Sequence, residues 1–508
     1  MSLLGIDVGT TGCKAVLFST EGQVLALSYS EYDFKHPEPE YAELDAEEVW
    51  SKIKQVIRDA AVKSSGDPVQ ATAVCSMGEA MVPVTADRII LGPSIMNFDA
   101  RGGEYLDKLP DFSNDLYLYG INGNTLANNY GLTKLLWIRD HRPGLYEKAD
   151  KFLNWGSFVS FMLGSEPVID YSLANRSLLF DLGRRDWSDE LLSKAGLDRN
   201  KLPVPKPSGV QIGTLLPNLA RELGLPEDLP IVTGAHDQCA NALGSGVIEE
   251  GQAMYGMGSF HCVVPVFQNR RDPKIMIRHG FNTEHHAVPD HFAIFIYQPG
   301  GMIVKWFRDT YAREEHKQAK AEGRDIYDTL FKELPEEPTT IFTLPHFSTM
   351  GPPDFTDDAC GLITGLHLNT TRGEILKGIV ESVAYTIRQG VEGLPDIGLD
   401  VRSFRAVGGG SKSDRWVQIL ADIIGTPFIR PRITEAGALG VAILAGSGIG
   451  VFDSQADGAR AMLSIDREFE PNQEKHRVYN ELYERYGRLW PLIGDFLRHE
   501  VNAPKLGG

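Results

Sequence analysis

The sequence predicts an α/β protein of two domains that are built alike, each with a mixed sheet flanked by helices, with a cleft between them. Near the N-terminus, three short β-type segments precede an amphipathic helix. A similar strand, tight turn and strand recur at residues 252–266, which indicates a duplicated domain. The length of 508 residues is enough for two sizeable cores. We therefore expect one domain at residues 1–246 and the other at 247–508.

The first domain is predicted to begin with an antiparallel meander. Short apolar segments at 3–8, 14–18 and 23–28 alternate with turns rich in Gly, Thr and Glu. A helix should follow, because Asp45 and Glu48 form a capping-box pattern before apolar residues at helical spacing. The expected local order is a meander and then a helix.

Further along the first domain, Ser188 is placed to cap a helix. The apolar run 229–233 then predicts a strand, and residues 234–238 predict a polar turn after it.

In the second domain, residues 252–257 and 261–266 are predicted to pair around a tight turn. Apolar residues at helical spacing predict helices at 374–391 and 475–497. The uncharged stretch 436–452 contains several glycines and is shorter than about 20 residues, so it predicts a buried helix and turn rather than a membrane span.

The composition excludes several classes of partner. The chain has 50 Lys and Arg against 68 Asp and Glu, for a net charge of −18, and it has no Lys/Arg-rich block. We therefore expect no nucleic-acid or membrane partner. Five scattered cysteines without a CxxC pattern indicate neither a disulfide framework nor a zinc site. With no signal peptide at the N-terminus, reduced thiols predict a cytoplasmic protein.

Residues 7–14, with the sequence Asp-Val-Gly-Thr-Thr-Gly-Cys-Lys, form the first candidate for chemistry. A strand that ends in a carboxylate and turns through Gly and Thr can aim N–H groups and hydroxyls at phosphate oxygens, while the Asp holds a magnesium ion. The P-loop pattern GxxxxGK[ST] is absent. An ordinary Gly/Thr hairpin turn is the alternative interpretation.

Three glycines at 408–410 form the second candidate, between a predicted strand and a helix that contains Trp416. They would let a planar ring or a phosphate approach the backbone, and the helix N-terminus favours an anion. The GxGxxG pattern is not matched, so a Rossmann fold is not indicated.

Asp237 is the candidate proton acceptor, because a carboxylate at a strand end can face the cleft and take the proton of an attacking hydroxyl. Neighbours on a strand point to opposite faces, so His236 is expected to be a structural histidine rather than a partner of Asp237. Glu79, Asp99 and Arg101 follow apolar runs, and each alone favours a solvated or salt-bridged role.

Taken together, these motifs resemble the FGGY family of carbohydrate kinases over essentially the whole chain, and so relatives of actin and hexokinase. Residues 7–14 match the family's phosphate loop D-x-G-T-T/S-x-x-K/R, and 408–413 with the Trp-containing helix match its adenine-side loop. Residues 134–141 resemble one family signature and 361–381 the other, with Gly131 and Gly378 as departures. The resemblance implies two ribonuclease-H-like domains of the actin/hexokinase type, with ATP and Mg²⁺ as cofactors.

The resemblance also implies a role for individual residues. Asp237 would be the catalytic base and, with Gln238, would contact the acceptor, while Asp7 would hold Mg²⁺. The residues implied in the sugar pocket are Glu79, Asp99 and Arg101. Those implied in nucleotide binding are Thr10, Thr11, Lys14, Gly258, Ser259, Gly301, Gly409, Gly410, Ser411 and Ser413. Met257 stands where relatives usually have Thr, which leaves one phosphate contact open.

The substrate implied is a small sugar or polyol, and a ketopentose such as xylulose is favoured. Residues 170–172 and 185–188 resemble xylulokinase and gluconate kinase relatives, yet Glu79 replaces the histidine of the xylulokinase Gln-Met-His-Gly motif. Glycerol, erythritol and gluconate therefore stay open as acceptors. So does an actin-type ATPase without a sugar substrate, although a hydroxyl-reading pocket argues against it. A homodimer is compatible with the sequence, which does not determine the oligomeric state.

Overall fold

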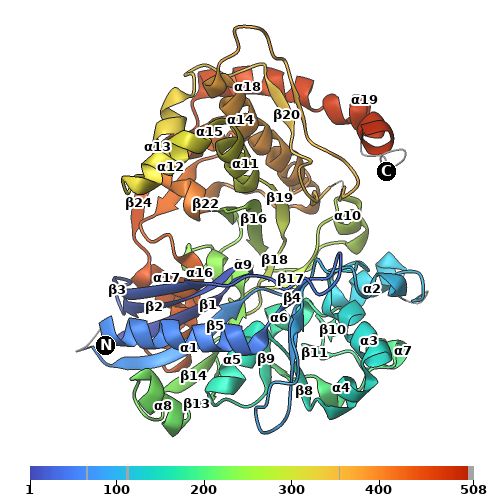
Figure 1. The fold of residues 1–508 in the computed structure, drawn as a ribbon, viewed down its shortest axis with the longest axis vertical. Helices are drawn as coiled ribbons and strands as arrows, with labels where there is room; N and C mark the ends of the chain where they lie inside the picture. Colours follow the sequence, from blue (N-terminus) through green and yellow to red (C-terminus); the bar gives the residue numbers. More distant parts are fainter. Residues whose placement is uncertain (64–66, 110–111, 113, 354, 502–508) are drawn as a thin grey trace.

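The computed structural model describes residues 1–63, 67–109, 112, 114–353 and 355–501, and it folds into two halves stacked along the long axis (Figure 1). The first sheet has the strand order β13-β14-β5-β1-β2-β3. β1, β2 and β3 are antiparallel neighbours, as the meander prediction requires, whereas β5 and β14 run parallel to β1. The strands are β1 (Ser2–Val8), β2 (Gly12–Ser19), β3 (Val24–Glu31), β5 (Val69–Ser76), β13 (Gln211–Thr214) and β14 (Pro230–His236).

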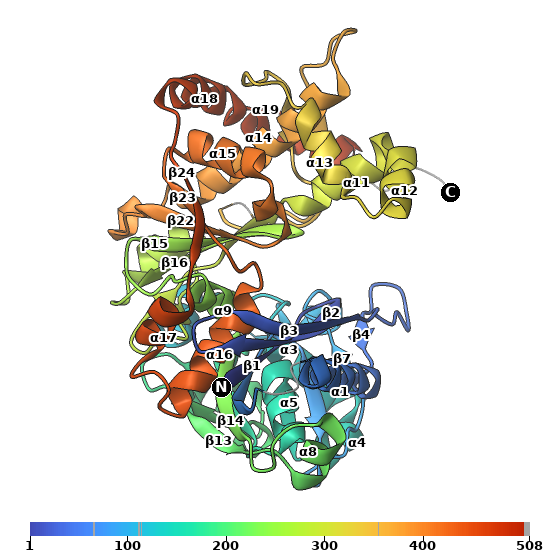
Figure 2. The same cartoon turned by 90° about the vertical axis from the view of Figure 1, so that its left-hand side faces the viewer.

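Helices cover both faces of this sheet (Figure 2). On one face, α1 (Ala46–Lys63) packs on β2 and β3, and α5 (Trp155–Leu163) packs on β5 and β14. On the other face lie α9 (Asp237–Gly244) and α16 (Ala436–Gly448). The alternation of side chains along β1 explains this arrangement, because Leu4 packs with the α1 core and Leu3 with the α16 core.

Smaller elements complete the first half, and they carry several of the site residues. They are β4 (Glu43–Leu44), β6 (Met81–Val84), β7 (Ser94–Ile95), α2 (Asp115–Asn122), α3 (Gly131–His141), α4 (Pro143–Lys148), β8 (Lys151–Asn154), β9 (Val168–Asp170), α6 (Tyr171–Asn175), β10 (Phe180–Asp181), β11 (Asp186–Trp187), α7 (Asp189–Ala195), β12 (Val204–Lys206) and α8 (Pro217–Leu223).

The second sheet repeats the plan of the first. Its order is β17-β18-β16-β15-β22-β23-β24, and β19 also pairs with β16. β15 is antiparallel to β16 and parallel to β22, which is parallel to β23, so β19-β16-β15-β22-β23 reproduces the pattern of β3-β2-β1-β5-β14. The strands are β15 (Gln252–Met257), β16 (Phe260–Phe267), β17 (Glu284–His285), β18 (Phe292–Ala293), β19 (Ile296–Pro299), β22 (Ser403–Val407), β23 (Phe428–Pro431) and β24 (Ile465–Phe469). The prediction of two similar halves is confirmed.

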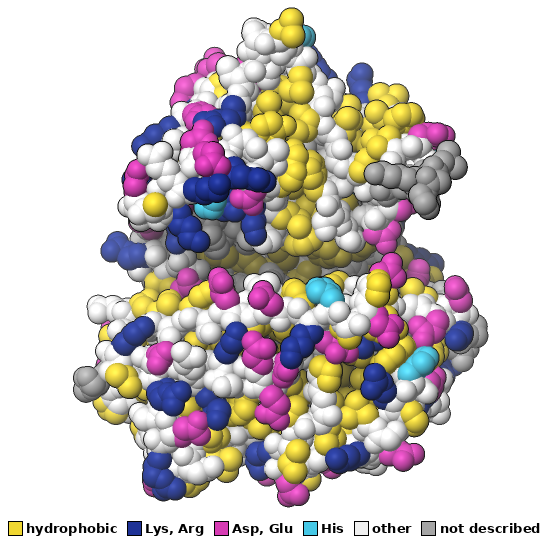
Figure 3. All heavy atoms as spheres, in the orientation of Figure 1, with side chains coloured by type: hydrophobic (Ala, Val, Ile, Leu, Met, Phe, Trp, Pro, Cys, Tyr) yellow, Lys and Arg dark blue, Asp and Glu magenta, His cyan; other side chains and the backbone are white. Residues whose placement is uncertain are grey.

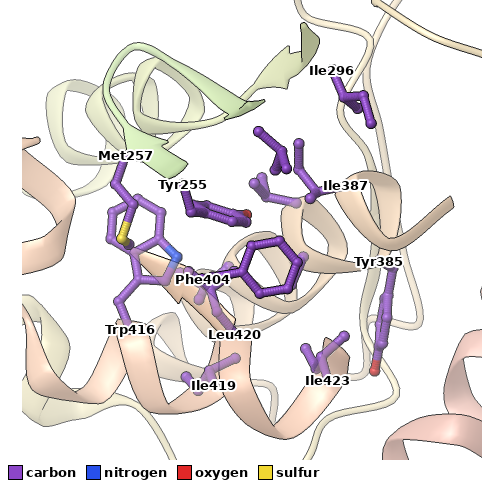
Figure 4. Packing of buried hydrophobic residues seen from close by; sticks show 14 of the residues in the cluster. Tyr255, Met257, Ile296, Tyr385, Ile387, Phe404, Trp416, Ile419, Leu420 and Ile423 are labelled. Atoms are coloured by element: carbon purple, nitrogen blue, oxygen red, sulfur yellow. The ribbon is translucent and has the colours of Figure 1, made fainter. Parts of the chain in front are cut away.

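The helices of the second half pack around an aromatic core that contains Tyr255, Phe404 and Trp416 (Figure 4). The remaining elements of this half are α10 (Pro273–Arg278), α11 (Gly301–Tyr311), α12 (Arg313–Ala321), α13 (Ile326–Leu330), β20 (Phe342–Leu344), β21 (Leu362–Thr364), α14 (Arg372–Val391), α15 (Asp414–Ile424), α18 (Gln473–Tyr486) and α19 (Leu489–Phe496). α17 (Gln455–Met462) instead packs on α9 and α16. No helix among the described residues is long and apolar enough to cross a membrane.

The two halves share one apolar layer. α9 and α16 contribute to a buried cluster that also contains Leu3 and Phe18 of the first sheet and Met254 and Val264 of the second. α16 therefore follows the second sheet in sequence but packs against the first, and a domain boundary at residue 246 stays a prediction. On the surface, a hollow runs between the halves (Figure 3).

Two local predictions are wrong. The helix expected at 475–497 is divided into α18, which ends at Tyr486, and α19, which begins at Leu489. Pro491 lies in the first turn of α19, where its missing N–H leaves no hydrogen bond unmade. The polar turn expected at 234–238 is instead the end of β14 followed directly by α9. The helices at 374–391 and 436–452 and the cap at Ser188 are confirmed.

Candidate active site

Hydrogen bonds fix the turn between β1 and β2, and the two threonines at its tip are exposed. Gly9 N–H donates to Gly12 O over 2.9 Å, and the Tyr32 hydroxyl donates to Gly9 O over 2.6 Å and to Gly12 O over 3.1 Å. Thr10 and Thr11 at the tip are exposed. The turn thus presents two hydroxyls on a fixed backbone, which suits contact with phosphate oxygens.

Asp7, at the end of β1, lies opposite Lys14 of β2. Lys14 Nζ is 2.6 Å from Glu435 Oε2 and 3.7 Å from Asp7 Oδ2, so one ammonium serves two carboxylates. A Cβ placed on Gly437 would lie 3.4 Å from Asp7 Oδ2, so the start of α16 lies against this carboxylate. Burial raises the pKa of Asp7, although Lys14 opposes the shift. Glu435 and Gly437 were not predicted as site residues.

Asp237 is the first residue of α9, directly after β14. Burial is the main cause that raises its pKa to about 7, and the charges of Asp7 and Glu79 add to the rise. Hydrogen bonds from the backbone and side chain of Gln238 act in the opposite direction. A carboxylate with a pKa near neutrality can accept a proton at physiological pH and release it again, as a general base must.

His236 is closer to Asp237 than expected. Its Nε2 lies 3.2 Å from Asp237 Oδ1, so the prediction that the two side chains point apart is wrong. The reason is that the strand ends at His236 and the helix begins at Asp237, which breaks the alternation of a strand. Burial lowers the pKa of His236 well below its usual value, so the imidazole is neutral and can donate to Asp237 only as one tautomer.

Glu79 lies in the loop between β5 and β6 and is 5% exposed, so it is not a solvated surface carboxylate. Arg176, which caps the C-terminus of α6, donates to Glu79 Oε1 through Nε over 2.7 Å and also through Nη2. Arg176 Nη1 donates to Glu284 Oε1 of β17 over 2.7 Å. Arg176 and Glu284 carry no sequence motif and were not predicted.

Asp99 and Arg101 form a separate buried cluster. The Arg101 guanidinium donates to both Asp99 oxygens and to Glu43, and it lies over the rings of Tyr41 and Trp137. The salt-bridged interpretation fits this geometry. Among the described residues, no hydrogen bond joins this pair to Glu79 or Asp237. Lys134 Nζ donates to the backbone of the same pair, to Asp99 O over 2.7 Å and to Arg101 O over 2.6 Å.

In the second half, the predicted nucleotide residues converge from three loops. Gly301 N–H donates to Gly258 O and Met302 N–H donates to Ser259 O, each over 3.0 Å, so the β15–β16 turn docks on the start of α11. A Cβ on Gly301 would lie 2.4 Å from Gly258 O, which excludes any larger residue without a shift of the turn. The β22–α15 loop lies beside them, since a Cβ on Gly410 would be 3.0 Å from Met257 Cβ.

The serine side chains of the β22–α15 loop form hydrogen bonds to backbone groups of the loop and of α15. Ser411 Oγ donates to Gly408 O over 2.7 Å, and Ser413 Oγ accepts from Trp416 N–H as the cap of α15. Gly409 is exposed, so the loop offers backbone to a ligand rather than hydroxyls. Met257 is 2% exposed and points beneath the loop towards Trp416, which explains how a Met is tolerated there (Figure 4).

The family of this chain follows from its similarity to known proteins. The models for the N-terminal and C-terminal domains of the FGGY family of carbohydrate kinases match residues 2–244 and 254–449. The chain belongs to the FGGY family of carbohydrate kinases. The FGGY kinase is 30% identical over 506 residues to the autoinducer-2 kinase of Klebsiella pneumoniae, a match that covers 96% of this chain and 93% of that protein.

Two solved structures of sugar kinases have the same fold. The xylulose kinase of Rhodospirillum rubrum is 26% identical with a TM-score of 0.85, and the match covers 98% of this chain and 100% of that one. The gluconate kinase of Lactobacillus acidophilus is 20% identical with a TM-score of 0.86 over 97% and 99% of the two chains, and it supports the fold alone. The FGGY kinase described here is therefore a phosphotransferase that acts on a small sugar-type substrate with ATP as the donor.

Proposed function

We propose that this FGGY kinase transfers the γ-phosphoryl group of ATP to a hydroxyl of a small, uncharged sugar or polyol, with Asp237 as the base. The observation that carries the proposal is the position of Asp237 at the start of α9, directly after β14, where burial and the charges of Asp7 and Glu79 raise its pKa to about 7. In the transfer, the acceptor oxygen forms a bond to the γ-phosphorus as its proton passes to Asp237. The bond from that phosphorus to the β,γ-bridging oxygen breaks, and ADP leaves.

Two turns are proposed to hold the nucleotide from opposite halves. The Thr10 and Thr11 hydroxyls would contact the phosphates from the first half, and the backbone around Gly258, Gly301 and Gly409 would contact the nucleotide from the second. The rigid hydrogen bonding of both turns supports these roles, because donors held in place cost little reorganisation during the reaction.

Asp7 is the proposed ligand of Mg²⁺, which would supply positive charge to the transferring phosphoryl group. The residues fit such an ion. Protein sites for Mg²⁺ use one or two carboxylates together with substrate phosphates. The charge of Asp7 raises the pKa of Asp237, and the charge of Glu435 raises the pKa of Asp7, so negative charge gathers here that a cation would offset. Lys14, paired with Asp7 and Glu435, would keep the Asp7 side chain directed along β1.

The charge around Glu79 favours an uncharged acceptor. Arg176 is already bonded to two carboxylates, Glu79 and Glu284, so the three residues together carry one negative charge. Ionised Asp237 adds another. A sugar acid would be repelled by this set, because like charges at close range cost free energy even when partly screened. Gluconate is therefore a poor candidate, whereas neutral polyols are not affected.

Two acceptors are favoured by specific observations. Xylulose is the ketopentose that the sequence favours, and a protein named xylulose kinase is 26% identical over nearly the whole chain. The second candidate is autoinducer-2, because curated relatives of 28–30% identity carry the name autoinducer-2 kinase.

A coupled assay of ADP release with xylulose, autoinducer-2, erythritol, glycerol and gluconate tests the proposal. We expect one of the first two to give the highest kcat/KM and gluconate to give the lowest. If no uncharged acceptor stimulates ADP release, or if gluconate is preferred, the proposed acceptor class is wrong.

A further inference from the structure

Arg176 connects a carboxylate of the first half to a carboxylate of the second. We propose that Arg176 and Glu284 are positioning residues for the acceptor. Arg176, supported by Glu284, holds Glu79 through Oε1, so that Oε2 is fixed in the direction from which it accepts a hydroxyl of the acceptor. This inference rests on the acceptor site proposed above. It adds to that site a support that comes from the opposite half of the molecule.

The hydrogen bonds at Glu79 are one-sided. Arg176 Nε and Nη2 both donate to Oε1, the first over 2.7 Å. Within the part of the chain that the structure describes, Oε2 receives no hydrogen bond, so it is available as an acceptor for a substrate hydroxyl. A carboxylate held in this way presents the lone pairs of Oε2 in fixed directions instead of rotating, and a rigid acceptor discriminates better between hydroxyl patterns.

Glu284 is a fixed point for Arg176. It is fully buried, and its Oε1 accepts from Arg176 Nη1 over 2.7 Å and from Asn282 Nδ2 over 3.0 Å. The backbone on either side of Glu284 is bonded to the first half. Thr283 N–H donates to Gly123 O over 2.8 Å, and His285 N–H donates to Asn175 Oδ1 over 3.1 Å.

The guanidinium is enclosed on its other sides as well. Its centre lies 4.8 Å from the ring of Tyr130 and 5.7 Å from that of Phe295. Gly78 leaves room beside it, because a Cβ there would lie 3.2 Å from both Arg176 Cγ and His236 Nε2. Arg176 is therefore packed next to the histidine that contacts Asp237, and its orientation is determined by two carboxylates and two rings rather than by solvent.

The main test is a double-mutant cycle of Glu79→Gln and Glu284→Gln, with the KM for the acceptor and the KM for ATP measured separately. We expect Glu284→Gln to raise the acceptor KM about tenfold, within the range for a disturbed buried polar contact, and to leave the ATP KM unchanged. If Glu284 acts through Glu79, it should have almost no further effect in the Glu79→Gln background.

Glu381→Gln is the matched control. Glu381 is also fully buried and ion-paired, with Lys377 in α14, and it is bonded to Tyr479 within the second half. This variant should lower the melting temperature and leave both KM values unchanged. A similar rise of the acceptor KM in Glu381→Gln would show that general destabilisation explains the effect, and the inference would be wrong.

The remaining outcomes separate the inference from the proposed function. If Glu79→Gln leaves the acceptor KM unchanged, the acceptor site itself is wrong and the inference falls with it. If Glu79→Gln raises it but Glu284→Gln does not, or if the two effects add, only the inference is overturned.

A second variant, Asn282→Asp, tests the inference if Glu284→Gln does not fold. Asn282→Asp keeps the acceptor for Phe295 N–H but removes the donor to Glu284. It should also raise the acceptor KM selectively, and a variant with unchanged acceptor KM would overturn the inference.

Discussion

The pH dependence of the reaction tests the role of Asp237 most directly. In free enzyme, kcat/KM for the acceptor follows the fraction of the base that is ionised. Burial, Asp7 and Glu79 raise the pKa of Asp237 from 3.8 to about 7. The acid limb of kcat/KM should therefore lie near neutrality rather than near pH 4.

The size of the effect follows from this shift. With a pKa of about 7, roughly 1% of Asp237 is ionised at pH 5 and about 90% at pH 8, so kcat/KM should fall about 90-fold between these values. With the ordinary value of 3.8 almost no change would occur over the same range. Because Glu79 contributes to the rise, Glu79→Gln should move the limb to lower pH.

The assay is initial-rate ADP release at acceptor concentrations well below KM, measured from pH 5 to 8. Burial also raises the pKa of Glu381 to about 7, so Glu381→Gln is the control for a limb caused by a structural carboxylate. This control should keep the wild-type midpoint. A kcat/KM that stays constant down to pH 5, or a midpoint that moves in Glu381→Gln and not in Glu79→Gln, would refute the assignment of Asp237.

Four further predictions concern the site. Asp237→Asn should lower kcat at least about 100-fold in the ADP assay. The same variant should raise the melting temperature at pH 8 but not at pH 4. Because the pKa of Asp237 is raised in the folded state, ionisation of Asp237 lowers the free energy of unfolding as the pH rises from 3.8 to about 7, by up to about 4 kcal/mol. Asn cannot ionise and avoids this loss. Gly301→Ala should raise the KM for ATP more than that for the acceptor, since its Cβ would displace Gly258. Acceptor with a non-hydrolysable ATP analogue should lower the radius of gyration in small-angle scattering, as hinge closure requires.

Each of these four predictions has a result that would contradict it. Near wild-type turnover of Asp237→Asn would exclude it as the base, and equal melting shifts at pH 4 and 8 would contradict its buried charge. An equal effect of Gly301→Ala on both KM values would remove the turn from the nucleotide site. An unchanged radius of gyration with both ligands bound would count against closure.

The elements that the sequence predicted well are those with local signals. The meander at the N-terminus and the hairpin at β15–β16 have alternating apolar residues on either side of Gly-containing turns. Asp45 and Ser188 cap the helices that were predicted to begin after them. The division between α18 and α19 was missed because apolar spacing continues through Gly487. Periodicity predicts which face is buried, but it does not locate a break in the backbone.

Site residues could be predicted from the sequence only where they lie in a motif of neighbouring residues. Asp7 and the glycines of the β22–α15 loop lie in recognisable turns. Arg176 and Glu284 do not, because their importance arises from contacts between residues 97 and 108 positions apart in the chain. Likewise, Glu435 reaches Lys14 across 421 positions, since α16 returns from the second half to the first sheet. Long-range pairing of this kind leaves no local pattern.

Contacts of two kinds join the halves on either side of the cleft. α9 and α16 join the halves through an apolar layer, whereas the segment around Glu284 joins them through polar bonds at the acceptor side. An apolar layer is non-directional and can tolerate small sliding, but the polar bonds at Glu284 lose their geometry when the halves shift. Closure should therefore pivot near Glu284 and Arg176 and bring the nucleotide loops towards Asp237. The acceptor would then keep its place against Glu79 while the phosphoryl donor approaches it.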